Sequence, residues 1–236
     1  MIGDPKRGGG GKFVWFFDLD NTLHDATHAI FQAIDSRMTD YVERHLVVDR
    51  AEANRLCELY WRRYGATLLG LVRHHAVNPH HFLRETHDFD VTEMLRTERG
   101  LARLFARLPG RKVLLTNAPC AYSSAVLRKL QLDRYFVAQY SIEHMRVHRA
   151  FRPKPSRLML RAMLARERVP QGRAVLVEDS RPNLKAARSL GFRTVLLTRH
   201  SLPRMQAGSR RARPGYVDLR IGSMHRLPRH LARLRR

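Results

Sequence analysis

Two aspartates, Asp18 and Asp20, are the side chains whose type and spacing point most directly to chemistry in this sequence. They follow the apolar run from Phe13 to Phe17, which predicts a buried strand. Carboxylates at positions i and i+2 after such a strand lie at its carboxyl end, where open parallel sheets bind their ligands. Two neighbouring carboxylates repel each other unless a cation or a shared proton compensates. The pair therefore suggests a metal-assisted reaction in which one carboxylate attacks and the other handles a proton.

Polar residues suited to phosphate chemistry also follow the later predicted strands. The strands are predicted at residues 112–115, 136–140 and 174–177, and the polar residues after them are Thr116, Asn117, Lys154, Glu178 and Asp179. With the two aspartates, this set holds a nucleophile, a proton donor, phosphate-binding groups and hard oxygen ligands for Mg²⁺. Their coincidence at successive strand ends is stronger evidence than any one of them alone.

The elements that must position these residues are indicated by hydrophobic periodicity. Between residues 24 and 108 apolar side chains recur at three- and four-residue steps, as at Ile30, Ile34 and Met38, and no strand-like alternation occurs. From residue 112 onward predicted strands alternate with predicted helices, which indicates a parallel sheet in an α/β fold. Helices are predicted at 98–108, 119–130, 156–167 and 182–190, and further strands at 194–197 and 216–221.

These elements divide the chain into four parts. We predict a flexible leader at 1–12, a core formed by 13–23 and 98–199, an all-helical cap at 24–97, and an Arg-rich C-terminal segment at 200–236. This last segment has an exposed loop at 204–214, and a last core strand at 216–221 and a helix are candidates within it. The cap also carries His74, His75, His80, His81 and His87, but adjacent histidines point in different directions, so a second metal site is not expected there.

The composition of the chain indicates the cellular compartment in which we expect the protein. The chain has 236 residues, 44% of them hydrophobic, and no apolar run is long enough to span a bilayer. The polar N-terminus has no secretory hydrophobic region. The two cysteines, Cys57 and Cys120, are far apart and lack metal-ligand spacing, which is typical of free thiols in a reducing compartment. We therefore expect a cytoplasmic protein with no membrane partner, and the sequence gives no indication of its oligomeric state.

The charge of the chain is strongly positive, with a formal net charge of +23 carried by 38 Arg and 6 Lys. Residues 199–236 hold eleven Arg against a single acid, Asp218. Such a segment can neutralise the phosphates of nucleic acid or of another polyanion. No nucleic-acid-binding motif accompanies the charge. The favoured explanation of the charge is therefore a genome-wide preference for Arg codons together with a solvated tail. Binding of RNA or another polyanion by this tail is the alternative.

The chain resembles the haloacid dehalogenase (HAD) superfamily of phosphohydrolases over residues 13–198. The family pattern is Asp-x-Asp-x-Thr, then Ser or Thr, then Lys, then an acidic pair, each after a core strand. It matches Asp18 to Thr22, Thr116, Lys154 and the pair Glu178-Asp179. The resemblance implies a Rossmann-like core with a helical cap inserted after the first strand. One departure is Asn183, where many relatives carry another acid.

The resemblance also implies a role for each matched residue. Asp18 would attack phosphorus to form an aspartyl-phosphate, and Asp20 would protonate the leaving alcohol and then activate water. Phosphoryl oxygens would be bound by Thr116, the Asn117 backbone N–H and Lys154. Mg²⁺ would be held by the carboxylate of Asp18, the backbone carbonyl of Asp20, and by Asp179, with Glu178 as a further ligand or beside them.

A closer resemblance is to the pyrimidine 5′-nucleotidase branch of this superfamily. It rests on residues 17–23, on 64–72 in the cap and on 178–187, and it implies UMP and CMP as substrates. His24 stands where that branch usually has Tyr, and Leu69 where relatives often have a basic residue. His24 and Tyr64 are the candidates for contacts beyond the phosphate. The alternatives are a sugar-phosphate or phosphoglycolate phosphatase of the same superfamily.

Overall fold

The computed structural model describes residues 13–170, 172–200 and 214–235. A six-stranded sheet lies at its centre, with the strand order β3-β2-β1-β6-β7-β8 and every neighbouring pair parallel. The strands are β1 (Val14–Phe17), β2 (Arg111–Leu115), β3 (Ala138–Tyr140), β6 (Ala174–Glu178), β7 (Arg193–Leu197) and β8 (Leu219–Ile221). The predicted α/β fold class is confirmed.

The central strand β1 is apolar on both faces because helices cover both sides of the sheet. Trp15 and Phe17 pack into the apolar cluster on one face, and Phe16 packs into the cluster on the other. All three side chains are fully buried. The indole N–H of Trp15 donates to the carbonyl of Pro109 at 2.7 Å, so the one polar atom of this side chain has a partner.

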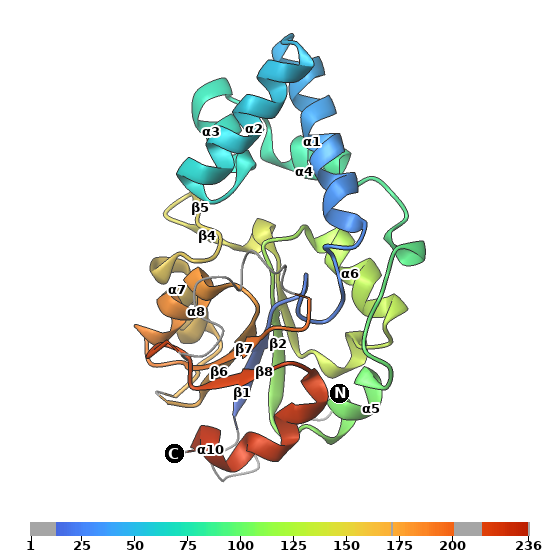
Figure 1. Cartoon of the computed structure of the whole chain (residues 1–236). Helices are drawn as coiled ribbons and strands as arrows, with labels where there is room; N and C mark the ends of the chain where they lie inside the picture. Colours follow the sequence, from blue (N-terminus) through green and yellow to red (C-terminus); the bar gives the residue numbers. More distant parts are fainter. Residues whose placement is uncertain (1–12, 171, 201–213, 236) are drawn as a thin grey trace, which may run out of the picture.

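Helices cover both faces of the sheet (Figure 1). One face is covered by α5 (Leu101–Arg107) and α6 (Cys120–Lys129), the other by α7 (Arg157–Arg166) and α8 (Arg181–Arg188). A 3₁₀ turn, η2 (Asp133–Tyr135), follows α6. The face of α5 also receives the C-terminal helices η4 (Met224–His230) and α10 (Leu231–Arg235).

The cap lies beyond one end of the sheet (Figure 1). It contains α1 (Ile30–Leu46), α2 (Arg50–Tyr64), α3 (Thr67–His75), α4 (Pro79–Thr86) and the 3₁₀ turn η1 (Val91–Glu93). These helices enclose an apolar cluster of their own around Tyr41, Tyr60 and Leu71. All the elements described between residues 24 and 97 are therefore helical, apart from an isolated bridge between Asp20 and His24.

A short hairpin between core and cap has no counterpart among the predicted elements. It consists of η3 (Ile142–His144), β4 (Arg146–Val147) and the antiparallel β5 (Ala150–Phe151). Strands of two residues are too short to produce a recognisable alternation of apolar and polar side chains. Ile142 and Phe151 are buried in the apolar cluster of the cap, so the hairpin packs the core against the cap.

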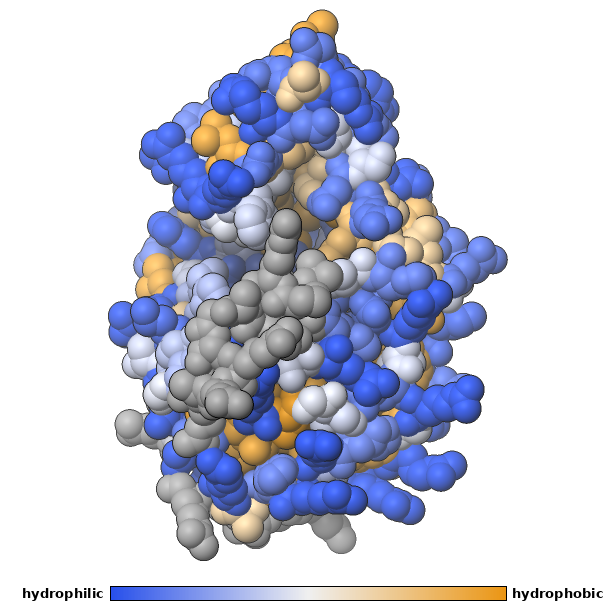
Figure 2. Space-filling model, in the orientation of Figure 1, coloured by the Kyte–Doolittle hydropathy of each residue, from blue (hydrophilic) through white to orange (hydrophobic). Residues whose placement is uncertain are grey.

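Part of the Arg-rich C-terminal segment belongs to the core. The strand predicted at 216–221 is present as β8, and Met224, Leu227 and Leu234 are buried in the same cluster as Trp15. The predicted leader at 1–12 and all but the last residue of the predicted loop at 204–214 lie outside the described residues. Hydrophilic residues cover most of the visible face (Figure 2), and none of the described helices could span a membrane.

Candidate active site

The candidate nucleophile, Asp18, is buried directly after β1 and is bound to a buried lysine. The ammonium of Lys154 lies 2.6 Å from Asp18 Oδ1 and 2.8 Å from Glu178 Oε2. The hydroxyl of Thr22 donates to the other oxygen of Asp18 at 3.2 Å. Three segments far apart in the chain therefore meet at the carboxyl ends of the strands, where the sequence placed them.

This cluster carries more negative charge than one lysine offsets. Burial and the charge of Glu178 raise the pKa of Asp18 to about 7, although Lys154 opposes the shift. Burial raises the pKa of Glu178 as well, and burial with the charge of Asp18 raises that of Asp179 to about 6. Burial lowers the pKa of Lys154, but the two carboxylates outweigh it, so its pKa lies above the ordinary value.

The acidic residues fit a divalent cation. Asp18, Glu178 and Asp179 offer carboxylate oxygens that lie within 4.8 Å of one another. Oxygen ligands at such a site suit Mg²⁺, and its charge would offset the repulsion that adds to burial in raising the three pKa values. Glu178 is held by donors of its own: Asn183 donates to Oε2 at 3.0 Å and the backbone N–H of Ser180 to Oε1 at 3.1 Å.

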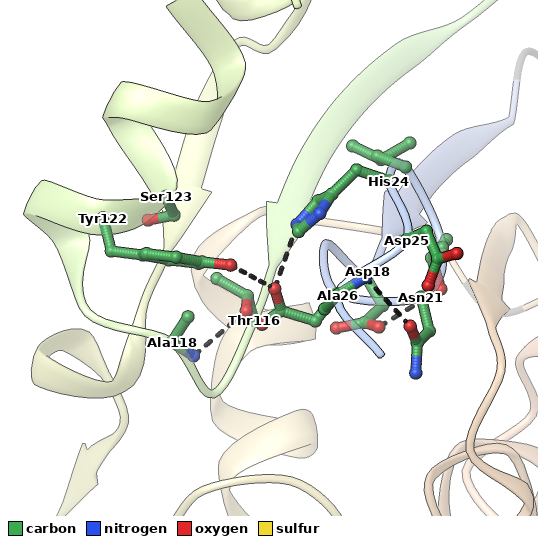
Figure 3. A network of polar contacts seen from close by, with 12 residues as sticks. Asp18, Asn21, His24, Asp25, Ala26, Thr116, Ala118, Tyr122 and Ser123 are labelled. Atoms are coloured by element: carbon green, nitrogen blue, oxygen red, sulfur yellow. Dashed lines mark hydrogen bonds and ion pairs between the residues drawn. The ribbon is translucent and has the colours of Figure 1, made fainter. Parts of the chain in front are cut away.

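The candidate acid and base, Asp20, is held through one oxygen. The hydroxyl of Tyr122 donates to Asp20 Oδ1 at 2.7 Å, and Nε2 of His24 lies 3.0 Å from the same oxygen. Figure 3 shows the labelled side chains of Tyr122 and His24 pointing toward one shared oxygen from different sides. Burial would raise the pKa of Asp20, but the neighbouring His24 and the hydrogen bond from Tyr122 hold it below the ordinary value. Oδ2 has no partner among the described residues.

His24 has a different place from the one predicted. Its side chain is fully buried against Asp20, so a direct contact with substrate is not what the structure shows. Its ring N–H is poorly aligned with the carboxylate despite the short distance, and Nδ1 has no hydrogen-bond partner among the described residues. The contact is therefore mainly electrostatic, and it acts on Asp20.

Thr116 and Asn117 follow β2, as the sequence predicted. Thr116 is buried and its Oγ1 accepts from the backbone N–H of Ala118 at 3.0 Å, so its hydroxyl proton is free to donate (Figure 3). The side chain of Asn117 holds the backbone of Lys154 through two hydrogen bonds of 2.9 and 3.1 Å. Its own backbone N–H has no partner among the described residues, as a phosphate-binding group requires.

Tyr64 lies at the end of α2, within an aromatic group of the cap. Its hydroxyl is 2.6 Å from Nε2 of His74, and the guanidinium groups of Arg63 and Arg73 lie over its ring at 5.6 and 5.8 Å. All these partners belong to the cap, and none of the described contacts joins Tyr64 to the catalytic cluster. Its predicted role in specificity therefore stays a prediction.

Two residues of the site were not identified from the sequence. Tyr122 lies on α6, where an aromatic side chain at helical spacing is typical of a core residue. His87 lies just after α4 and packs edge-on against Tyr122, with the ring centres 5.5 Å apart. The contact of Tyr122 with Asp20 joins residues that are 102 positions apart in sequence, and no local pattern predicts it.

A family model of haloacid dehalogenase-like hydrolases matches residues 14–191, a range that includes every residue of this site. The chain belongs to this family of hydrolases. Phosphate metabolism protein 8 from Saccharomyces cerevisiae is 31% identical to it over 75 residues, which span 32% of this chain and 22% of the yeast protein.

Solved structures of HAD proteins share the fold of most of the chain. A HAD phosphatase from Thermococcus onnurineus aligns with a TM-score of 0.63 at 19% identity, covering 93% of this chain and 97% of that chain. A HAD hydrolase from Bacillus subtilis, whose structure contains magnesium and reveals interdomain movement, aligns with a TM-score of 0.58 at 16% identity, covering 94% and 99%. At these identities the likeness concerns the fold alone.

Proposed function

We propose that this HAD hydrolase is a Mg²⁺-dependent phosphomonoesterase that acts through an aspartyl-phosphate, and that its substrates are pyrimidine nucleoside 5′-monophosphates. The observation that carries the reaction class is the placement of Lys154 between Asp18 and Glu178, beside Asp20 with one free oxygen. A carboxylate, a fixed cation and a separate proton donor are the groups that phosphoryl transfer to an enzyme carboxylate requires.

In the first step a carboxylate oxygen of Asp18 forms a bond to phosphorus as the bond to the alcohol oxygen breaks. Asp20 gives its proton to that leaving oxygen. Lys154 and the hydroxyl of Thr116 stabilise the charge on Asp18 and on the phosphoryl oxygens, in a buried site where such interactions are strong. Because Tyr122 and His24 occupy Oδ1 of Asp20, the proton is carried on Oδ2.

In the second step Asp20 takes a proton from water, whose oxygen attacks phosphorus. The bond between phosphorus and Asp18 breaks, and inorganic phosphate leaves. Mg²⁺ would be held by Asp18, Asp179 and the backbone carbonyl of Asp20, and would supply positive charge for the phosphoryl group. Both oxygens of Glu178 already accept hydrogen bonds. We therefore place Glu178 beside the ion, where it orients Lys154, and not among the ligands of the ion.

The substrate proposal rests on the resemblance of residues 17–23, 64–72 and 178–187 to the pyrimidine 5′-nucleotidase branch. The cap segment at 64–72 is the part that faces the nucleoside in that branch. Sugar phosphates and phosphoglycolate are the alternatives, since they require the same chemistry and differ only in the group beyond the phosphate.

Phosphate release from a panel of monophosphate esters tests both parts. The panel contains UMP, CMP, dUMP, AMP, GMP, phosphoglycolate and sugar phosphates, with Mg²⁺, and Asp18→Asn serves as the inactive control. We expect the pyrimidine nucleotides to have the highest kcat/KM. A preference for other esters would replace the substrate and keep the mechanism, whereas no release from any ester would contradict the proposed activity.

A further inference from the structure

The protonation state of His87 is fixed by its neighbours. Its Nδ1 lies 3.1 Å from the carbonyl of Leu83 and 2.9 Å from the hydroxyl of Thr86. That hydroxyl donates its own proton to the carbonyl of Phe82 at 2.8 Å, so both groups beside Nδ1 can only accept from it. Nδ1 therefore carries the ring proton, and Nε2 of the neutral ring is an acceptor.

Nε2 of His87 has no hydrogen-bond partner among the described residues. Burial lowers the pKa of this histidine to about 4, although the charge of Asp20 opposes the shift. The ring is thus neutral at physiological pH, and Nε2 presents a lone pair. The His87 side chain is only partly buried, and its Nε2 is not among the fully buried atoms that lack a partner. An acceptor that is held rigidly and can be reached from outside is suited to a ligand that donates a hydrogen bond.

The ring of His87 lies beside the proton donor of the reaction. It packs edge-on against Tyr122, whose hydroxyl is bound to Asp20. His87 and Asp20 are also close enough to influence each other's ionisation. Val91, four residues further on, is buried in the same apolar cluster as Tyr122, so the segment that carries His87 is packed on the core.

We propose that His87 and Tyr122 form a subsite for the leaving alcohol, in which Nε2 of His87 accepts a hydrogen bond from a hydroxyl group of that alcohol. The subsite favours polyhydroxylated leaving groups, such as sugars and glycerol, over apolar alcohols of the same size. This inference rests on the proposed phosphatase activity, because the leaving oxygen must lie at Asp20 for the alcohol to reach His87.

The test compares pairs of esters that differ in hydroxyl groups alone. One pair is glycerol 3-phosphate and n-propyl phosphate, and the other is UMP and its 2′,3′-dideoxy analogue. We expect the wild-type enzyme to have the higher kcat/KM for the hydroxylated member of at least one pair. In His87→Phe, which keeps a ring against Tyr122 but has no acceptor, this ratio should fall roughly three- to tenfold, the effect of one hydrogen bond.

Two further variants separate hydrogen bonding from packing. His87→Gln places an amide oxygen near the position of Nε2 and should recover part of the ratio. His80→Ala removes an exposed histidine from α4, the helix that precedes His87, and should leave the ratio unchanged. The inference is overturned if the wild type shows no preference in either pair, or if His87→Phe retains the full ratio. Inactivity of the wild type on every ester would instead contradict the proposed function.

A spectroscopic measurement tests the acceptor without turnover. Long-range ¹H–¹⁵N NMR spectra of the imidazole rings, compared between wild type and His87→Gln, identify the signals of this histidine. We expect a neutral ring with the proton on Nδ1 at pH 7. A proton on Nε2 would remove the acceptor and overturn the inference, whatever the activity data show.

Discussion

Lys154 is the residue on which the catalytic cluster depends most. It is the one cation in direct contact with Asp18 and Glu178 among the described residues, and its side chain is 2% exposed. A buried charge loses most of its solvation, so it is stable only while its partners are present. The same holds for the two carboxylates, which would repel each other without the ammonium.

We predict that Lys154→Met reduces kcat at least a hundredfold, because it removes a fixed charge from the reacting groups. It should also lower the free energy of unfolding by about 3 kcal/mol at pH 8, the usual cost of breaking a buried pair. The loss should be smaller at pH 5, where the raised pKa values let the carboxyl groups take up protons. Urea unfolding at the two pH values measures both effects.

Lys129→Met, at an exposed position on α6, is the matched control and should change neither stability nor activity. Equal destabilisation of Lys154→Met at pH 5 and pH 8 would contradict the charge argument, because neutral carboxyl groups do not repel each other.

The sequence brought the candidate catalytic residues to attention because they follow strands. Asp18, Thr116 and Asp179 lie next to apolar runs that are visible in the sequence, and parallel strands bring their carboxyl ends together. The burial of His24 against Asp20 was not predicted, because the direction of a side chain after a sharp turn has no periodic signal. Tyr122 and His87 were missed, because their roles depend on packing between helix and cap.

At the scale of the elements, the six strands of the sheet and the helices α5 to α8 lie within a few positions of their predicted ranges. The hairpin β4–β5 was not, since its strands have two residues each. The hairpin joins core and cap through Phe151, which follows the core strands in sequence but is buried in the apolar cluster of the cap. The boundary between cap and core is therefore less sharp than the division at residues 24–97 suggests, and packing across it restricts how the cap can move.

Gly70 on α3 allows the cap helices to approach each other closely. A Cβ atom at this position would lie 2.1 Å from Cγ of Tyr60, a buried residue of α2. Alanine normally stabilises a helix relative to glycine by about 1 kcal/mol. We predict the opposite sign for Gly70→Ala, a loss of about 1–3 kcal/mol, because the collision forces the two helices apart.

Gly222→Ala is the matched control, because a Cβ atom there would meet no atom within 4 Å and the backbone does not require glycine. Its free energy of unfolding, measured by urea denaturation, should differ from the wild type by less than about 0.5 kcal/mol. If Gly70→Ala is as stable as Gly222→Ala, the close packing of α2 and α3 is not required.

For the whole molecule, the net charge of +23 is the most prominent feature of the sequence, but it does not indicate which basic residues belong to the folded core. Residues 214–235 supply β8 and the helices that pack against α5, so this part of the basic segment stabilises the core. Truncation of the segment would therefore unfold the protein. Binding of a polyanion is better tested by the salt dependence of RNA binding to the full chain, where each phosphate contact contributes to the slope.

The stability of the whole molecule should depend on pH through the acidic cluster. The pKa values of Asp18 and Asp179 rise from 3.8 to about 7 and about 6. The folded protein then binds more protons than the unfolded chain between these values, so the contribution of the two groups to stability is lost as pH rises from about 4 to about 7.

Mg²⁺ should reverse this loss, since it binds the ionised carboxylates. We predict that excess Mg²⁺ raises Tm more at pH 8 than at pH 5, and that Asp179→Asn reduces the difference. Thermal melts of the two proteins with and without Mg²⁺ measure it. An equal rise at both pH values would indicate that the ion binds groups other than this cluster.

Detection of the covalent intermediate tests the central claim most directly. The enzyme is mixed with a substrate identified by the panel, quenched in acid within the first turnovers and reduced with borohydride, which converts an aspartyl-phosphate to homoserine. Peptide mass spectrometry should find homoserine at position 18, and none in Asp18→Asn. Continued release of phosphate with no homoserine at position 18, or with homoserine at another aspartate, would contradict the assignment of Asp18 as the nucleophile.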